Sequence, residues 1–191
     1  PKTLFVHGYL TDDGQKMSKT IGNVIDPNKV IEQYGTDATR YYLLREIPSY
    51  SDGDFSDRRF KEVYNADLAN GLGNVIARVA KLCETGNLTF DPPSSFSISQ
   101  PVLDRLNEYR FHDALGVIWA VVEAIDKSLS QDEPWRLKGD DLKKTLEKQV
   151  VRIRQIAYEL QMFLPETAEK ILEQFKGPQV KSQPALFPRI P

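Results

Sequence analysis

The chain has 191 residues, of which 40% are hydrophobic and 10% are aromatic, so it can form a packed core and is not generally disordered. Its 25 Lys and Arg residues nearly balance its 27 Asp and Glu residues. This balance excludes a surface that is basic throughout, so any contact with RNA has to be local. The single cysteine, Cys83, excludes an internal disulfide and a zinc site built from several cysteines, and it indicates a reducing compartment such as the cytoplasm. The absence of an apolar run of about 18 residues predicts no membrane-spanning helix.

The first predicted elements are a strand and a loop. Residues 4–10 are mostly apolar and indicate a strand. A lone strand cannot satisfy its ladder of hydrogen bonds, so we expect the rest of its sheet to lie in a preceding, missing part of the protein. Residues 11–25 are rich in Gly, Asp and Ser and are predicted to form a loop.

Helix signals follow the loop. Asp26 is a suitable N-cap, Pro27 is a suitable first helical residue, and Gly35 ends this helix. Thr36 can cap a second helix, which Pro48 stops.

Beyond Ser56 the pattern is that of long amphipathic helices. One helix is predicted from Asp57 to about Thr85, where Gly71 and Gly73 suggest close packing or a kink. Further helices are predicted to begin near Pro101, Phe111, Asp140 and Pro165. Their apolar stripes, which include Trp119 in the helix that begins near Phe111, have to be buried against one another.

The predicted fold is therefore mainly α. A short strand, a loop and two linking helices occupy residues 1–55, and an α-helical bundle occupies residues 56–191.

Two lysines, Lys16 and Lys19, lie three residues apart in the predicted loop. Ammonium groups on flexible stems suit a polyanion such as a triphosphate. Spacing alone is weak support, because most such pairs in loops are solvated surface charges.

The whole stretch Lys16-Met17-Ser18-Lys19-Thr20, followed by Ile21-Gly22-Asn23 and Pro27, resembles the KMSKS signature of class I aminoacyl-tRNA synthetases. Thr20 stands where the usual signature has a second serine, so a hydroxyl is kept. The resemblance implies that residues 16–20 bind ATP. It also implies that Lys16 and Lys19 are catalytic, because their charge stabilises the triphosphate and the departing pyrophosphate.

A polar face is predicted on the first long helix. Asn70, Asn74 and Arg78 recur at four-residue spacing and therefore share one side of a helix. Their amide and guanidinium groups can form hydrogen bonds with unpaired base edges. The same spacing also describes an ordinary exposed stripe.

Trp135 follows Pro134 in a predicted break between helices. An aromatic ring held there can stack on an unpaired base, or it can plug the end of the bundle. Basic residues follow it closely and form either a track for phosphates or a solvated face: Arg136, Lys138, Lys143, Lys144 and Lys148.

These features, with residues 164–171 and the closing residues 186–190, look like the C-terminal part of the methionyl-tRNA synthetase family over essentially the whole chain. The resemblance implies that the CAU anticodon stem-loop of tRNA(Met) is bound, with the first base stacked on Trp135. The residues it implies for this anticodon contact are Asn70, Asn74, Arg78, Pro134 and Trp135.

The resemblance also implies that the parent enzyme uses ATP and Mg²⁺ to charge tRNA(Met) through methionyl-adenylate. We expect the chain alone to bind no cofactor, to hold no metal and to be inactive, because the HIGH signature and the nucleotide-binding fold of the N-terminal catalytic domain have no counterpart in it. Two alternatives stay open. In the first, the chain is the corresponding fragment of the isoleucine, leucine, valine or cysteine enzyme. In the second, it is a stand-alone tRNA-binding module.

Overall fold

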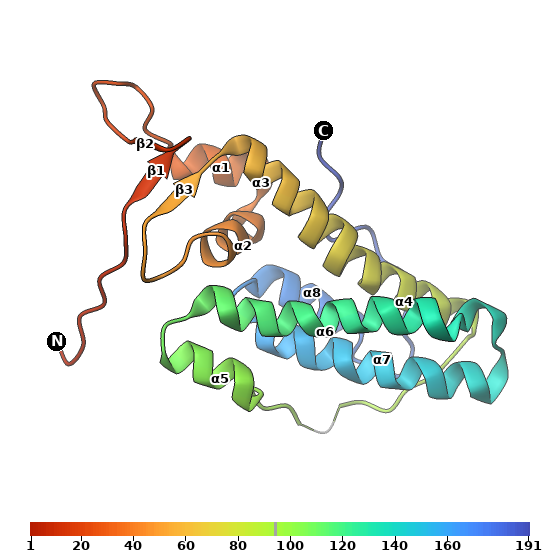
Figure 1. Ribbon diagram of the computed structural model, residues 1–191. Coiled ribbons are helices and arrows are strands. Elements are labelled where there is room, and N and C mark those ends of the chain that lie inside the picture. Colours follow the sequence, from red (N-terminus) through yellow and green to blue (C-terminus); the bar gives the residue numbers. More distant parts are fainter. Residues whose placement is uncertain (94) are drawn as a thin grey trace.

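The computed structural model describes residues 1–93 and 95–191. Figure 1 shows a small sheet and two short helices beside a bundle of longer helices. The mainly α fold predicted from the sequence is confirmed. Among the described residues, none of the helices has the length and the apolar character that a membrane span requires.

The sheet has three short strands, β1 (Leu10–Asp12), β2 (Gln15–Lys16) and β3 (Gly53–Phe55). Their order is β2-β1-β3, with β1 antiparallel to β2 and parallel to β3. Thr11 is central to this sheet, because it pairs with Lys16 on one side and with Asp54 on the other.

The strand predicted at residues 4–10 is wrong except for its last residue. Leu4 and Tyr9 are 80% and 81% exposed. The segment therefore buries neither of its faces, and no packing holds it in a strand. The loop predicted at residues 11–25 is also partly wrong, because it begins with a hairpin. Asp13 and Gly14 both have positive φ angles, 47° and 76°, and an Asp-Gly pair is a strong signal for such a turn.

Two helices follow the lysine-containing loop. Helix α1 (Pro27–Tyr34) begins as predicted, with the Asp26 carboxylate accepting a hydrogen bond from the backbone N–H of Asn28 at 2.9 Å. Helix α2 (Thr36–Arg45) starts directly after Gly35, which has a φ of +86°. Thr36 is therefore the first residue of α2 and not its cap.

The long helix predicted from Asp57 to Thr85 has three sections. These are α3 (Asp57–Val63), the π-helical η1 (Tyr64–Gly73) and α4 (Asn74–Thr85). A Cβ atom at Gly73 would lie 2.9 Å from the Leu68 carbonyl oxygen, and one at Gly71 would lie 3.3 Å from the Ala66 carbonyl oxygen. The close packing predicted at both glycines is confirmed, and π-helical turns within α-helices are frequent at functional sites.

The bundle continues with α5 (Gln100–Asn107), α6 (Phe111–Asp132), the 3₁₀ turn η2 (Pro134–Arg136), α7 (Gly139–Leu160) and α8 (Pro165–Gln174). Helix α6 packs against α5 and α7, and α8 packs against α7. Figure 1 shows α6 and α7 side by side, joined at one end of the molecule. The C-terminal tail returns to the long helix, where the Asn65 amide donates to the Ile190 carbonyl oxygen at 2.8 Å.

One continuous core joins the two parts of the chain. Tyr41 and Tyr42 of α2 belong to the same buried cluster as Leu72 and Ile118 of the bundle. Trp119, which the sequence places in the core, is 5% exposed and packs against Tyr41, with the ring centroids 4.4 Å apart. The boundary between residues 55 and 56 stays a prediction.

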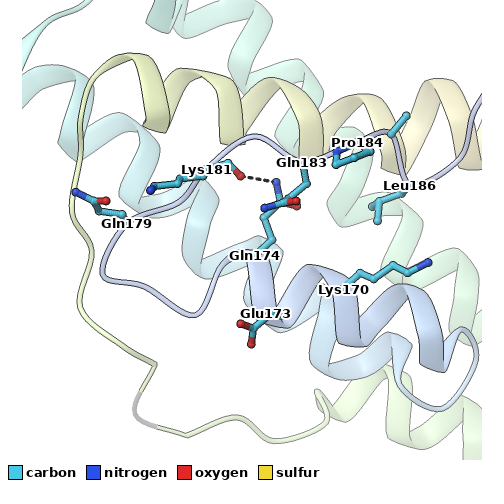
Figure 2. A pocket seen from close by; sticks show the side chains of 9 residues that line it. Lys170, Glu173, Gln174, Gln179, Lys181, Gln183, Pro184 and Leu186 are labelled. Carbon is cyan, nitrogen blue, oxygen red and sulfur yellow. Dashed lines mark hydrogen bonds between the residues drawn. The ribbon is translucent and has the colours of Figure 1, made fainter.

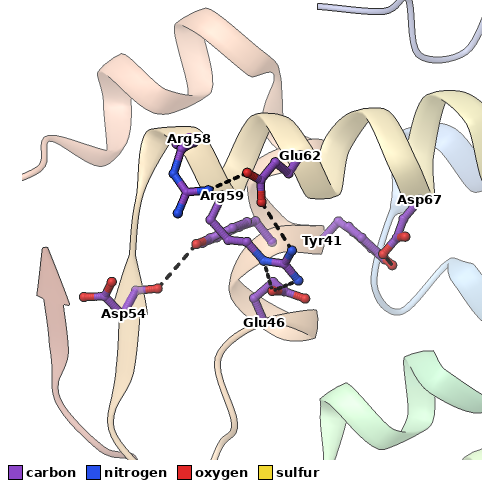
Figure 3. Close-up of polar contacts among 8 residues, drawn as sticks. Tyr41, Glu46, Asp54, Arg58, Arg59, Glu62 and Asp67 are labelled. Carbon is purple, nitrogen blue, oxygen red and sulfur yellow. Dashed lines mark hydrogen bonds and ion pairs between the residues drawn. The ribbon is translucent and has the colours of Figure 1, made fainter. Parts of the chain in front are cut away.

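Polar contacts also fasten α2 to the long helix, as Figure 3 shows. The Tyr41 hydroxyl donates to Asp67 Oδ2 at 2.7 Å, and the guanidinium of Arg59 pairs with Glu46 at 2.7 Å. Burial and the Asp67 carboxylate raise the pKa of Tyr41 above its ordinary value, so its hydroxyl keeps its proton and remains a donor. These contacts hold α2 against the long helix of the bundle, and with α2 they hold the neighbouring sheet.

Candidate functional site

The Lys16–Thr20 loop starts in the sheet and ends in a turn. Lys16 is in β2, whereas Lys19 is in the turn after it, and both side chains are exposed. The Asn23 side chain braces this turn. Its Oδ1 accepts from the backbone N–H of Ser18 at 2.8 Å, and its Nδ2 donates to the Lys16 carbonyl oxygen at 3.3 Å. One amide therefore holds the backbone on both sides of Met17.

Hydroxyl groups and backbone atoms complete the turn. The Ser18 Oγ accepts from the backbone N–H of Thr20 at 3.2 Å, and the Ser18 carbonyl oxygen accepts from the N–H of Gly22 at 3.0 Å. The Thr20 side chain is exposed. The loop thus has a defined backbone while it presents its charged side chains to solvent.

The hairpin that carries Lys16 is anchored to β3 by one carboxylate. Asp54 Oδ1 accepts from the Thr11 hydroxyl at 2.5 Å and from the backbone N–H of Gly14 at 2.7 Å. Its neighbour Asp52 accepts from the backbone N–H of Tyr9 at 2.7 Å. These carboxylates have structural roles, and among the described residues no group of three or more His, Cys, Asp or Glu residues is placed to hold a metal ion.

Lys16 and Lys19 form no ion pair with any carboxylate in residues 1–93 and 95–191. Among the described residues, the lysines that form ion pairs are Lys61, Lys81 and Lys176. Two free positive charges on a braced turn suit an anionic ligand, because the charge does not have to be released from an internal partner before it can bind.

The second group of candidate residues lies on the long helix. Asn70 is in η1, Asn74 is the first residue of α4, and Arg78 follows one turn later. Both asparagines are exposed, and Arg78 is partly exposed. The Asn70 Oδ1 accepts from Nε of Arg189 in the C-terminal tail at 2.8 Å.

Arg78 has a partner that the sequence analysis missed. Its Nη1 pairs with Asp126 Oδ1 of helix α6. Asp126 and Asn70 line the same cavity of about 240 Å³ between η1 and α6, so the structure brings Asn70 and the Arg78 ion pair to the same side of the molecule. No sequence signal joins Arg78 to Asp126, because 48 residues separate them.

Trp135 is presented to solvent by the turn between α6 and α7. It is 52% exposed, whereas the preceding Pro134 is buried. The alternative in which this ring plugs the end of the bundle is therefore wrong. Glu133 has a left-handed backbone with φ 43°, which ends α6 and redirects the chain. Asp126 lies six residues before the end of α6, or about 9 Å along its axis.

The basic residues after Trp135 differ in their contacts. Arg136 pairs with Glu133 at 2.6 Å. Lys138, Lys144 and Lys148 are exposed and form no ion pair with a described carboxylate, and Lys143 is partly exposed. Positive charge therefore follows the exposed indole in the sequence, in η2 and the first turns of α7.

Another hollow lies at the C-terminal tail and holds none of the predicted site residues. Figure 2 shows it between α8 and residues 179–186, with Lys170 and Lys181 at its edges. Its volume is about 500 Å³, and the Gln174 amide donates to the Lys181 carbonyl oxygen across it at 2.8 Å.

The lysine loop and the exposed indole are far apart. Figure 1 places the β1–β2 hairpin and the connection between α6 and α7 at opposite sides of the molecule. The lysine loop and the exposed indole therefore belong to separate candidate surfaces, and the amides and the Arg78 ion pair lie along the long helix.

Comparison with known proteins shows which proteins this chain resembles. Residues 1–80 match the family model described as "tRNA synthetases class I (M)". The methionine–tRNA ligase of Brucella melitensis is 37% identical over 96% of this chain, and that of Clostridium acetobutylicum is 35% identical over 100% of it. Over nearly its whole length, the chain is similar to methionine–tRNA ligases.

Solved structures of a methionyl-tRNA synthetase have the same fold. The Mycobacterium tuberculosis enzyme bound by methionyl-adenylate superposes with a TM-score of 0.81 at 28% identity, covering 95% of this chain and 43% of that one. The apo form of the same enzyme superposes with a TM-score of 0.83 at 25% identity. The match covers 100% of this chain and 44% of the apo enzyme. The chain spans only 39% and 35% of the two methionine–tRNA ligases named above.

Proposed function

We propose that this chain is part of a methionine–tRNA ligase, which charges tRNA(Met) with methionine through methionyl-adenylate in an ATP-dependent reaction. The observation that supports this most directly is the similarity to methionine–tRNA ligases along nearly the whole chain. The two separate surfaces support it as well, because this reaction needs both a site for ATP and a site for tRNA.

The lysine loop contacts ATP in this proposal. Lys16 and Lys19 place positive charge where negative charge develops on the triphosphate and the leaving pyrophosphate, which lowers the barrier to adenylate formation. Met17, Ser18 and Thr20 complete the ATP-binding stretch. Mg²⁺ is usually bound by one or two carboxylates together with substrate phosphates, so it would arrive with ATP and need no protein cage in the described residues.

The long helix and the turn at η2 read the CAU anticodon. Asn70, Asn74 and Arg78 provide hydrogen bonds to base edges, and the exposed ring of Trp135 stacks on the first base. The buried Pro134 fixes the backbone before the ring, so little conformational freedom is lost when a base stacks there.

The remaining part of the enzyme completes the catalytic domain. The chain covers about two fifths of its relatives, and its N-terminal segment exposes Leu4, Val6 and Tyr9. We propose that the preceding catalytic domain covers these side chains, that the chain alone is inactive and that the enzyme works in the cytoplasm. The single buried thiol of Cys83 is compatible with that compartment.

Two measurements test this function. The purified chain should show no ATP–pyrophosphate exchange, and measurable exchange would contradict its proposed inactivity. The chain should bind a 17-nucleotide anticodon stem-loop with CAU more tightly than one in which the first base is changed to G. Equal affinities would remove the anticodon assignment.

The same binding assay separates the proposal from a fragment of another class I synthetase. A fragment of the isoleucine, leucine, valine or cysteine enzyme would prefer the anticodon of its own tRNA. The names of the relatives support methionine. A stand-alone tRNA-binding module would bind the stem-loop and would need no second surface with free lysines.

A further inference from the structure

Helix α7 buries the amide of Gln149 on the side that faces α6. Gln149 is 2% exposed and lies between the fully buried Leu146 and Ile153 on the inner side of the helix. Burying an amide costs free energy unless it forms hydrogen bonds, so an apolar side chain is the expected residue here. The other buried polar side chains of α7, Arg154 and Glu159, bind backbone groups of segments outside the helix. Gln149 instead binds a side chain of α6.

Three hydrogen bonds in series pass through this amide and end at the last residue of α6. Arg152 Nη1 donates to Gln149 Oε1 at 3.4 Å, and Gln149 Nε2 donates to Ser128 Oγ at 2.9 Å. Ser128 Oγ in turn donates to Asp132 Oδ2 at 2.8 Å. Gln149 and Ser128 therefore each accept one hydrogen bond and donate another, which connects α7 to the end of α6 and satisfies the buried amide.

The chain reverses directly after Asp132, where Glu133 adopts a left-handed backbone with φ 43°. Residues other than glycine are uncommon in this conformation, so the surrounding contacts have to hold it. Trp135 comes two residues later, in the turn η2. Figure 1 shows α6 and α7 joined at this end of the bundle. The position of the exposed indole therefore depends on how α6 ends.

A hollow beside this turn makes the hydrogen bonds more important. Its volume is about 390 Å³, and it lies between the last turns of α6, Leu137 and the middle of α7. It is lined by Ser128, Asp132, Leu137, Thr145, Lys148, Gln149 and Arg152. Because this space is open, packing alone cannot fix how the end of α6 lies on α7, as it does in the rest of the core. The hydrogen bonds through Gln149 have to supply that fixed geometry.

We propose that Gln149 and Ser128 are positioning residues for Trp135. With Asp132 they fix the last turn of α6 against α7, and thereby the place of the indole that follows. An aromatic ring that is held in place before binding loses little conformational freedom when a base stacks on it, so a loosened turn lowers affinity. The proposal rests on the proposed function for the stacking base, and it adds two residues that lie outside the predicted anticodon contacts.

A double-mutant cycle with Trp135 tests this role. Ser128→Ala removes the central hydroxyl, and Ala is favourable in a helix, so α6 stays formed. We expect Ser128→Ala to weaken binding of the CAU stem-loop about threefold or more, but by less than about 1.5-fold in a Trp135→Ala chain. Ser130→Ala is the matched control, because the Ser130 hydroxyl donates to the Asp126 carbonyl oxygen within α6. The control should leave the affinity unchanged in both chains.

The cycle separates positioning from a general structural role. A residue that only supports the fold would weaken binding equally with and without the indole. That result would overturn the proposal and leave the anticodon function intact, and so would an unchanged affinity of Ser128→Ala.

Gln149→Leu is the second variant in the same assay. It replaces the buried amide with an apolar side chain of similar size, so the free energy of unfolding should not fall. Binding of the CAU stem-loop should nevertheless weaken as it does in Ser128→Ala. Wild-type affinity in folded Gln149→Leu would contradict the role of the amide, and circular dichroism checks the fold. If Gln149→Leu fails to fold, the cycle with Ser128→Ala decides.

A measurement without RNA covers the case in which no stem-loop binds and the proposed function itself fails. The backbone N–H groups of Arg136 and Leu137 close the turn, each donating to a carbonyl oxygen three residues earlier, at 2.8 and 3.1 Å. In both variants their hydrogen exchange should be about tenfold faster or more, because the turn opens more often, and in Ser130→Ala it should not change. Faster exchange without RNA binding would support the positioning and contradict the proposed function. Unchanged exchange at both amides would overturn the positioning role on its own.

Discussion

The Asp37 carboxylate of α2 accepts a hydrogen bond from the backbone N–H of Thr167, 130 residues later in the chain, at 2.6 Å. Thr167 lies in the first turn of α8, whose N-terminal N–H groups have no helical partner. Asp37 therefore caps a helix that is distant in sequence. Arg40, one turn later, donates to the Phe163 carbonyl oxygen at 2.7 Å and holds the preceding corner. Two side chains of α2 thus fix the connection between α7 and α8.

Replacing this distant cap should destabilise the protein. Asp37→Ala leaves the Thr167 N–H buried without an acceptor, which costs about 1–3 kcal/mol. We expect the free energy of unfolding in urea to fall by that amount. Glu166→Ala removes an exposed acid from the same turn of α8 and should change the free energy of unfolding by less than about 0.5 kcal/mol. Equal losses in the two variants would show that Asp37 is not a cap.

Removing the exposed indole should weaken RNA binding and leave the fold intact. Stacking of a base on an aromatic side chain contributes about 1–3 kcal/mol, so Trp135→Ala should weaken binding of the CAU stem-loop at least fivefold. Trp135 is 52% exposed, and its loss leaves no cavity in the core, so the unfolding midpoint should stay close to that of the wild type. Fluorescence anisotropy with a labelled stem-loop measures the binding. An unchanged Kd would exclude the stacking role.

Arg78 should contribute more to RNA binding than to stability. Its ion pair with Asp126 is partly exposed, and such pairs contribute less than about 1 kcal/mol to stability. We expect Arg78→Ala to weaken binding of the CAU stem-loop about tenfold, because a guanidinium hydrogen bond to a base edge contributes about 1–3 kcal/mol. Arg58→Ala removes a similar charge that pairs with Glu62 one turn away, and it should leave affinity unchanged. An equal loss of affinity in both variants would mean that Arg78 attracts the RNA only through its positive charge and makes no specific contact with a base.

The brace at Asn23 should control the backbone of the lysine loop. Asn23→Ala removes the acceptor of the Ser18 N–H and the donor to the Lys16 carbonyl oxygen. Hydrogen exchange at Ser18 should become at least tenfold faster, since the amide then exchanges from an open turn. Asn28→Ala, an exposed asparagine at the start of α1, serves as the control. Unchanged exchange at Ser18 would mean that the turn is held by other contacts.

The lone thiol should be unreactive while the protein is folded. Burial raises the pKa of Cys83 to about 12, so the neutral thiol predominates at pH 7 and at pH 9. The unfolded chain has a thiol pKa of about 8.5, so the contribution of this group to stability is fully present below that pH. That contribution is lost as pH rises toward 12.

Reaction with a disulfide reagent measures this difference. Native protein should react at pH 9 only at the rate at which it opens, whereas protein in urea should react at once. Rapid reaction of the native protein would show that Cys83 is accessible, contrary to its burial.

Much of the helical architecture was predictable because it depends on neighbours in sequence. The three- and four-residue spacing around Ile118 and Ile153 requires a buried stripe, and both residues are fully buried. Asp26 and Gly35 bound α1 through local backbone bonds, so their roles were visible without a fold. The Asp13-Gly14 turn is equally local, so the hairpin was predictable as well, although residues 11–25 were predicted to form one loop.

The candidate site was predictable only in part. The free charge of Lys16 was not predictable, because Asp12 and Asp13 lie only four and three residues before it. The exposure of Trp135 was left open, since a loop tryptophan can face either way. Packing decided it by burying Pro134 and leaving the ring outside.

By itself, the sequence determined where the helices lie and which residue types are available for anions and bases, because helix periodicity and capping act over a few residues. Only the tertiary structure decided that Arg78 faces Asp126, that Asp37 caps α8 and that Trp119 packs against Tyr41. Each of these depends on how two distant helices pack. That geometry is set by the whole core, and no short stretch of sequence encodes it.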